Sequence, residues 1–340
     1  MSNPYNTDLD RNPANYQPLT PLSFLERAAE VYPKHIAIIH GSIKRSYLEF
    51  YKRSLRLASA LSKQGIVRGD TVSVILPNTP AMLESHYGVP MCGAVLHSIN
   101  TRLDPETIAY QLDHSNSKAL IVDREFLETA KSSLKIAKVS PILIDYNDSE
   151  HKVNESLPNA TEYESFLLEG DESFEWVMPE DEWDAISLNY TSGTTGNPKG
   201  VVSHHRGAYL LAQGNAMIAS INKHSVYLWT LPMFHCNGWC FPWTIPALAG
   251  THVCLRNVNA SAIFNAIHRY KVTHFCGAPI IMQMIINASE EERLPFSHEV
   301  SMMTAAAPPP APVSAPASPR HRFCARRACV CAQVPGPADA

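Results

Sequence analysis

The sequence lacks a long, uninterrupted apolar run. Its most apolar stretch, residues 226–249, is interrupted by three prolines, a histidine and an asparagine, so it is a poor candidate for a membrane span. Residues 1–19 are polar and contain no apolar core segment, so no secretory signal peptide is expected. The net charge is −4 and no basic patch precedes residue 319, which argues against nucleic acid as a partner.

The sequence also lacks the cysteine pattern of a disulfide framework or of a zinc site. Five cysteines lie before residue 300 without regular spacing, and no second Cys/His cluster accompanies His235, Cys236 and Cys240. We therefore expect free thiols in a reducing compartment and predict no metal ligands.

Strand-like and helix-like runs alternate along the 340 residues. In residues 47–63, for example, Leu48, Tyr51 and Leu55 recur at three- and four-residue spacing, as on an amphipathic helix. The alternation predicts an α/β fold, a layered αβ architecture with mostly parallel sheets. The predicted helices are 22–31, 47–63, 81–87, 105–112, 125–138, 161–168, 205–220, 241–248, 260–270 and 280–288, and the predicted strands are 36–39, 44–46, 71–76, 93–97, 119–122, 142–144, 185–190, 226–231, 251–255, 273–276 and 300–303.

Residues 145–182 are unusually acidic. Thirteen of these thirty-eight positions are Asp or Glu, too many for a core-forming element. We therefore interpret the segment as a surface connection between two α/β halves.

The most informative segment, residues 190–201, reads Tyr-Thr-Ser-Gly-Thr-Thr-Gly-Asn-Pro-Lys-Gly-Val. Its glycines permit backbone conformations in which successive N–H groups turn toward an anion, its hydroxyls add donors, and Lys199 adds positive charge. Together they predict a loop that binds a polyphosphate. It is not a Walker A loop, because Pro198 precedes Lys199 and Gly200 follows it. The alternative is a solvated, glycine-rich hairpin without a ligand.

Residues 191–201 resemble the phosphate loop of the AMP-forming adenylating enzymes, and the residues around them are most similar to plant acyl-activating enzymes of the benzoate- and butyrate–CoA ligase type. The resemblance covers about residues 21–313. It implies the incomplete N-terminal domain of a two-step ligase, in which a carboxylic acid and ATP give an acyl-adenylate and pyrophosphate, and coenzyme A then displaces AMP. The implied catalytic residues are Thr194, Thr195 and Lys199, and the implied ATP-binding residues are Thr191, Ser192, Gly193, Thr194, Thr195, Gly196, Lys199, Ala305, Ala306, Ala307 and Pro308.

Two further motifs resemble parts of the acyl site of this family. Residues 231–239, Leu-Pro-Met-Phe-His-Cys-Asn-Gly-Trp, are similar to a His/aromatic motif, which implies that His235, Asn237 and Trp239 bind the acid. Residues 276–280 are similar to the turn that lines the acyl pocket, which implies that Gly277 lets a substrate approach the backbone. The alternatives are a packed aromatic turn with a satisfied histidine and an ordinary strand-to-helix turn.

The resemblance ends in the tail. Of the thirty-six residues from 305 to 340, nineteen are Ala or Pro and no apolar periodicity survives, so no core-forming element is expected there. The expected organisation is a polar extension (1–20), a truncated AMP-binding domain (21–313) and a disordered, unrelated tail (314–340), with the C-terminal lid domain absent. We attribute the tail to a frameshift, a mis-spliced exon or a faulty gene model, with a natural disordered tail as the alternative.

The family's Tyr-Gly-x-Thr-Glu motif, which helps to hold magnesium, and its lid lysine have no counterpart in the tail. The resemblance implies ATP, coenzyme A and a small carboxylic acid as substrates, and Mg²⁺ bound by a ligand in the missing region. Little or no turnover is expected of this chain. An inactive nucleotide- or acid-binding fragment and an adenylation module serving a carrier protein are the alternatives. The family is cytoplasmic or peroxisomal, and because the sequence ends Ala-Asp-Ala without a peroxisomal tripeptide, we expect a cytoplasmic protein.

Overall fold

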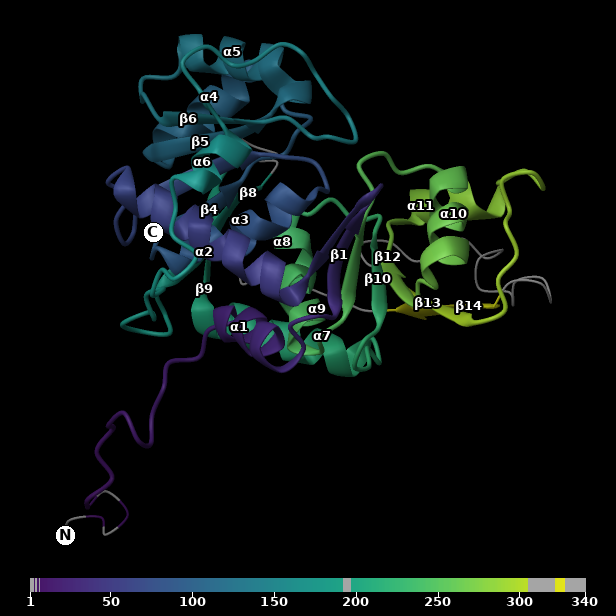
Figure 1. Ribbon diagram of the computed structural model, residues 1–340, viewed down its shortest axis with the longest axis horizontal. Helices are drawn as coiled ribbons and strands as arrows, with labels where there is room; N and C mark the ends of the chain where they lie inside the picture. The colour runs from purple at the N-terminus through teal and green to yellow at the C-terminus, as the bar shows by residue number, and fades with distance from the viewer. Residues whose placement is uncertain (1–2, 4, 6, 192–196, 305–321, 328–340) are drawn as a thin grey trace.

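The computed structural model describes residues 3, 5, 7–191, 197–304 and 322–327, the last of these as backbone only. Two seven-stranded sheets dominate it (Figure 1). Sheet A has the order β14 (Arg322–Arg327), β13 (Glu299–Thr304), β12 (His274–Cys276), β10 (Val226–Trp229), β11 (Thr251–Cys254), β1 (Ile36–His40) and β2 (Ile43–Ser46). Sheet B has the order β7 (Thr161–Glu162), β6 (Ile142–Tyr146), β5 (Ser117–Asp123), β3 (Thr71–Ile75), β4 (Val95–Ser98), β8 (Ala185–Tyr190) and β9 (Gly200–His204).

Neighbouring strands are parallel except in the pairs β1–β2 and β8–β9, which are antiparallel. The predicted α/β fold with mostly parallel sheets is therefore confirmed. Parallel pairs need crossover connections, which helices usually supply, so the alternating sequence pattern and the sheet topology have the same origin.

The chain does not divide into an N-terminal and a C-terminal half. β1 and β2 come first in the sequence but belong to sheet A, where β1 pairs with β11. The acidic segment 145–182 does not separate two halves either, because β8, which follows it, returns to sheet B and pairs with β4. The prediction of two halves joined by this segment is wrong, since strand pairing decides sheet membership and local composition does not reveal it.

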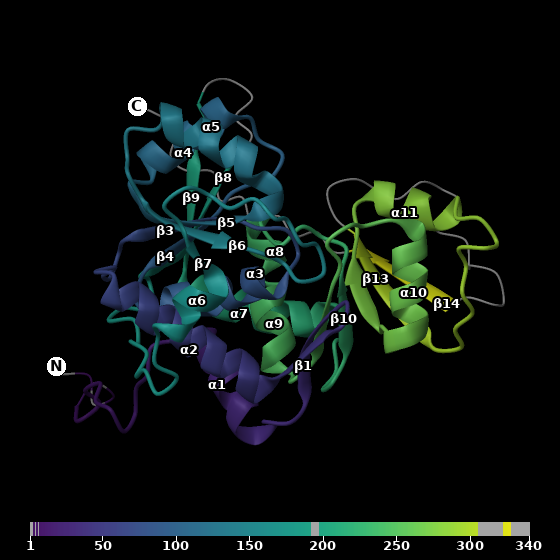
Figure 2. The same ribbon diagram turned by 45° about the horizontal axis from the view of Figure 1, so that its top comes forward.

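Helices cover both outer faces and fill the space between the sheets (Figures 1 and 2). The helices on the outer face of sheet B are α4 (Pro105–His114) and α5 (Leu127–Ile136), which follows the 3₁₀ turn η2 (Arg124–Phe126), and those on the outer face of sheet A are α10 (Ala260–Tyr270) and α11 (Pro279–Ile286). The helices in or beside the central layer are α1 (Leu22–Val31), α2 (Tyr47–Lys63), α3 (Pro80–Met91), α6 (Tyr163–Leu168), α7 (His205–Ile218), α8 (Cys236–Trp239) and α9 (Phe241–Ala247).

The strands face both the central core and an outer core. In β10, Tyr227 and Trp229 belong to the central core, whereas Leu228 packs with the α10 side chains. In β5, Ile121 faces the central core and Leu120 faces α4 and α5. Successive side chains of a strand alternate between faces, so a strand buried on both faces reads as a continuous apolar run.

Helix α3 is buried along its whole length and continues past the predicted end at Tyr87 to Met91. Pro90 has no N–H for the His86 carbonyl oxygen four residues earlier, and Trp243 Nε1 donates to that oxygen instead, at 3.2 Å. The helix therefore accommodates a proline because α9 compensates for the lost hydrogen bond. Among the described helices, none is both long and apolar enough to cross a membrane.

Strand β14 forms within the tail, for which the sequence predicted no core-forming element. Its backbone pairs parallel with β13, with Glu299 opposite Arg322 and Thr304 opposite Arg327. The difference has a simple cause: main-chain hydrogen bonding along the open edge of a sheet does not require an apolar pattern.

Candidate functional site

The predicted phosphate loop closes a hairpin at the carboxyl end of β8. Tyr190 lies opposite Gly200 in the antiparallel β8–β9 pair, and the Thr191 N–H donates to the Lys199 carbonyl oxygen at 3.0 Å. Thr191 and Lys199 therefore stand side by side at the base of the loop. The other predicted loop residues lie outside the described part of the chain: Ser192, Gly193, Thr194, Thr195 and Gly196.

Lys199 is exposed. No ion pair between described residues involves its ammonium group. An accessible lysine that has no carboxylate partner among the described residues and stands at the base of a glycine-rich hairpin is suited to contact a polyphosphate.

Neighbouring elements support the base of the loop. The Tyr190 hydroxyl hydrogen-bonds Nδ1 of His114 at 2.7 Å, and the Tyr110 hydroxyl donates to the Pro198 carbonyl oxygen at 3.5 Å. Partial burial raises the pKa of Tyr190 from its ordinary value of 10 to about 12. The buried His97 ring lies next to the Tyr190 ring, with 5.0 Å between their centroids.

A hydrogen-bond network joins this hairpin to the His/aromatic motif. The Ser98 hydroxyl, at the end of β4, donates to Asn189 Oδ1 at 3.0 Å, and Asn237 Nδ2 donates to Ser98 Oγ at 3.4 Å. The Asn189 amide also donates to Oδ1 of Asn237. Sequence reasoning missed Ser98 and Asn189, whose only signals were their positions at strand ends. The network connects the predicted acid site with a residue two positions before Thr191.

The motif that contains Asn237 and Trp239 folds into a left-handed turn. Five successive residues, 236–240, have φ values between 43° and 64°, and Gly238 is the only glycine among them. The left-handed conformation costs roughly 1–2 kcal/mol for each non-glycine residue, so the surroundings must hold it. Asn215 Nδ2 donates to the Trp239 carbonyl oxygen at 2.6 Å. Gly238 is required because a Cβ there would lie 2.8 Å from the Trp229 ring.

The structure brings His235, Asn237 and Trp239 together within this one turn. His235 is accessible, Trp239 is half-buried and Asn237 is buried. Partial burial lowers the pKa of His235, so its imidazole is mainly neutral at pH 7 and can donate one hydrogen bond without carrying a charge. The preceding residues are pinned by Asn78, whose Oδ1 accepts from the Met233 N–H at 2.8 Å.

Gly277 follows β12, at the carboxyl end of sheet A. Its N–H donates to the Met303 carbonyl oxygen at 2.9 Å. A Cβ at this position would meet Met302 Cε at 2.8 Å and Ile281 Cβ at 2.9 Å, so packing within the protein is a sufficient reason for glycine. The predicted substrate role of Gly277 stays a prediction. Ala305, Ala306, Ala307 and Pro308, predicted to contact adenine, lie outside the described residues.

The described residues contain no cluster of side chains that could hold a metal ion on its own. Nowhere among them do three or more His, Cys, Asp and Glu side chains form a group that could hold a metal. Proteins usually hold Mg²⁺ with one or two carboxylates together with substrate phosphates, so its binding stays a prediction, and no step of the chemistry below is assigned to it.

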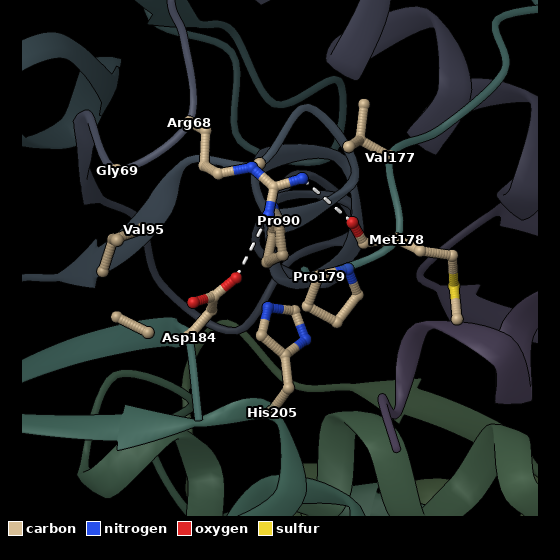
Figure 3. A pocket seen from close by; sticks show the side chains of 11 residues that line it. Arg68, Gly69, Pro90, Val95, Val177, Met178, Pro179, Asp184 and His205 are labelled. Atoms are coloured by element: carbon tan, nitrogen blue, oxygen red, sulfur yellow. Dashed lines mark hydrogen bonds and ion pairs between the residues drawn. The ribbon is translucent and has the colours of Figure 1, made fainter. Parts of the chain in front are cut away.

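A small cavity lies at the other end of sheet B (Figure 3). It has a volume of about 110 Å³, and its lining includes Val95 and Asp184, which stand at the amino ends of β4 and β8. The Arg68 guanidinium pairs with Asp184 at 3.1 Å and donates to the Met178 carbonyl oxygen at 3.0 Å, so these polar groups satisfy one another. Because the loop follows the carboxyl end of β8, this cavity is separate from the predicted site.

Residues 25–325 match the family model described as AMP-binding enzyme. The chain is 50% identical over 315 residues to "Acetate/butyrate--CoA ligase AAE7, peroxisomal" of Arabidopsis thaliana, which covers 89% of this chain and 55% of that protein. It is also 50% identical over 315 residues to "Acetate--CoA ligase CCL3" of Humulus lupulus, which covers 89% of this chain and 56% of that protein. The chain spans about half the length of the curated relatives it matches.

Solved structures share the fold. The anthranilate CoA ligase AuaEII in complex with anthranoyl-AMP has a TM-score of 0.77 at 20% identity, over 89% of this chain and 58% of that chain. The N-terminal domain of FACL13 from Mycobacterium tuberculosis has a TM-score of 0.75 at 23% identity, over 87% of this chain and 72% of that chain. At these identities the likeness concerns the fold alone.

Proposed function

Because this chain belongs to the AMP-binding enzyme family, we propose that it forms the nucleotide- and acid-binding part of an AMP-forming acid–CoA ligase. In the proposed reaction, a carboxylate attacks the α-phosphorus of ATP to give an acyl-adenylate and pyrophosphate. The thiol of coenzyme A then attacks the acyl carbon, forms the thioester and releases AMP. The network of Ser98, Asn189 and Asn237 carries this proposal, because it joins the base of the loop to the turn that contains the candidate acid-binding residues.

The first step brings a carboxylate toward phosphates of the same charge, so the protein must neutralise the phosphates and hold the attack in line. We assign this task to Lys199 and to the donors of Thr191, Ser192, Gly193, Thr194, Thr195 and Gly196. The exposure of Lys199 supports the assignment. Ala305, Ala306, Ala307 and Pro308 are the proposed contacts to adenine.

We further propose a short aliphatic carboxylate as the acid. The two relatives at 50% identity are named for acetate and butyrate, whereas the relative named for trans-cinnamate is 44% identical. The neutral imidazole of His235 would donate to the carboxylate, and Trp239 and Gly277 would border the acyl chain. Coenzyme A is the proposed thiol acceptor, and the cytosol or the peroxisome is the proposed compartment.

The experiment compares ATP binding with pyrophosphate release. We expect calorimetry to detect ATP binding to the 340-residue polypeptide. The ligase proposal further requires pyrophosphate release that depends on butyrate in a protein extended by a relative's remaining sequence. ATP binding without release in that extended protein would favour an inactive binding fragment. Release followed by transfer to a carrier protein but not to coenzyme A would favour an adenylation module.

The decisive variant is Lys199→Ala. A hydrogen bond to a charged group contributes about 1.5–3 kcal/mol, so we expect ATP binding to weaken by about 10- to 150-fold. In the extended protein, loss of one transition-state donor predicts a rate about 100-fold lower. Lys118→Ala is the matched control, because Lys118 is also exposed but lies at the amino end of β5. Equal ATP binding by the two variants would remove Lys199 from the site.

A further inference from the structure

Asn189 lies between the predicted ATP loop and the predicted acid site. It is the penultimate residue of β8, two positions before Thr191. Its side chain donates to Asn237 Oδ1 and accepts from the Ser98 hydroxyl at 3.0 Å. The half-buried Asn189 side chain thus connects β8, which leads into the loop, with Asn237 in the turn, forty-eight positions later in the sequence.

The turn at the far end of this connection is strained. Cys236, Asn237, Trp239 and Cys240 all have positive φ, which residues with a Cβ avoid. Such a conformation persists only where surrounding contacts hold it. Apart from hydrogen bonds within the turn itself, three sets of contacts do so. Asn215 holds the Trp239 carbonyl oxygen, Trp243 and Thr244 hold the Cys240 carbonyl oxygen, and Ser98 and Asn189 hold the Asn237 amide. A small displacement of Asn189 therefore acts directly on one of these three sets of contacts.

We infer that Asn189 is a positioning residue that couples occupancy of the phosphate loop to the conformation of the acid-site turn. The inference rests on the proposed function, because it takes ATP as the ligand of the loop. Phosphates bound by Thr191 and Lys199 displace the end of β8. The Asn189–Asn237 hydrogen bond transmits this displacement to the turn. Because the turn is strained, the displacement changes the populations of its conformations. The acid site is thereby adjusted once the nucleotide is present.

Cys236 provides a direct reporter of the turn. It is exposed, whereas the other described cysteines, Cys92, Cys240, Cys254 and Cys276, are buried. The experiment measures the rate at which iodoacetamide alkylates Cys236, peptide by peptide with mass spectrometry, with and without ATP. Each protein receives ATP at a concentration that calorimetry shows to be saturating. In the wild-type chain we expect ATP to change the rate about threefold or more.

The test variant is Asn189→Leu, which keeps the approximate side-chain volume and removes both hydrogen bonds. We expect the alkylation rate of Cys236 in this variant to be the same with and without ATP. Ser98→Ala, a smaller change at the centre of the same network, should also abolish the effect of ATP on Cys236 alkylation. It replaces Asn189→Leu as the test variant if that variant does not fold. Ser187→Ala is the matched control: it lies on the same face of β8, and its buried Oγ has no hydrogen-bond partner among the described residues.

Two results would overturn the inference while leaving the proposed function intact. One is ATP binding to the wild-type chain without any change in Cys236 alkylation. The other is an ATP effect that persists in Asn189→Leu and Ser98→Ala, which would mean that the nucleotide shields the turn directly. A wild-type chain that binds no ATP in the calorimeter would instead refute the proposed function, and the coupling with it.

Discussion

Acidification to pH 5.5 should destabilise this protein strongly, because four of its histidines are buried in the neutral form. Burial lowers the pKa of His86 and His205 to about 4, and that of His97 and His252 to about 3. Nε2 of His86 has no hydrogen-bond partner among the described residues, so a proton added there would be both buried and unpaired. In His252, Nδ1 accepts from Trp229 Nε1, so a proton added to that nitrogen would displace a buried hydrogen bond.

The sign and size of the effect follow from proton binding. In the unfolded chain each histidine titrates near its ordinary pKa of 6.5, so below that pH the unfolded state binds protons that the folded state excludes. The contribution of these neutral histidines to the free energy of unfolding is fully present above pH 6.5. It is lost as the pH falls toward 4 for His86 and His205 and toward 3 for His97 and His252. At pH 5.5 each group costs about 1.4 kcal/mol, or about 6 kcal/mol for the four, against a typical folding free energy of about 5–15 kcal/mol.

Urea unfolding at pH 7.5, 6.5 and 5.5, followed by tryptophan fluorescence, measures this loss. His252→Gln removes one titrating ring and keeps an acceptor for Trp229 Nε1, which now donates to His252 Nδ1 at 3.0 Å. Between pH 7.5 and 5.5, we expect the free energy of unfolding of His252→Gln to fall by about 1.4 kcal/mol less than that of the wild type. His151→Gln, at an exposed position, should leave the loss unchanged. Equal stability at pH 7.5 and 5.5, or an unaltered loss in His252→Gln, would refute the reasoning.

Two further predictions concern packing and buried charge. Gly277→Ala should lower the free energy of unfolding by about 1–3 kcal/mol, because its Cβ meets Met302 and Ile281. Gly214→Ala in α7, where no atom lies within 4 Å of the added Cβ, should instead raise the free energy of unfolding by up to about 1 kcal/mol. A change of the same sign in Gly277→Ala and Gly214→Ala would contradict this account. Arg256→Met should cost about 3–5 kcal/mol, because it leaves two buried carboxylates, of Asp123 and Asp148, without their guanidinium partner. Urea unfolding measures all of these changes. Arg102→Met, at an exposed position, is the control for Arg256→Met. An equal loss of unfolding free energy in these two variants would exclude the buried-charge explanation.

The positions of several elements could be predicted to the residue. Helices α2 and α10 and strand β8 have the predicted bounds, Tyr47–Lys63, Ala260–Tyr270 and Ala185–Tyr190. Their signals are local: apolar periodicity sets the length, and α2 begins at a capping box in which Ser46 and Glu49 satisfy each other's backbone N–H groups. The phosphate-loop motif is local as well, and its assignment to ATP stays a prediction within the proposed function.

Other features could not be predicted because they depend on distant partners. The sequence places the end of the third helix near Tyr87, but Trp243 satisfies the carbonyl group that Pro90 leaves free, and the helix continues. Likewise, the residues that hold the candidate acid site, Ser98, Asn189 and Asn215, carry no motif of their own.

Short-range order in the chain therefore specifies the α/β alternation, most helices and strands, and the loop at the end of β8. Tertiary packing alone decides that β1 and β2 join sheet A and that Asn189 meets Asn237. The physical reason is range. Periodicity and capping act over a few residues, whereas strand pairing and buried polar contacts depend on which surfaces the folded chain brings together.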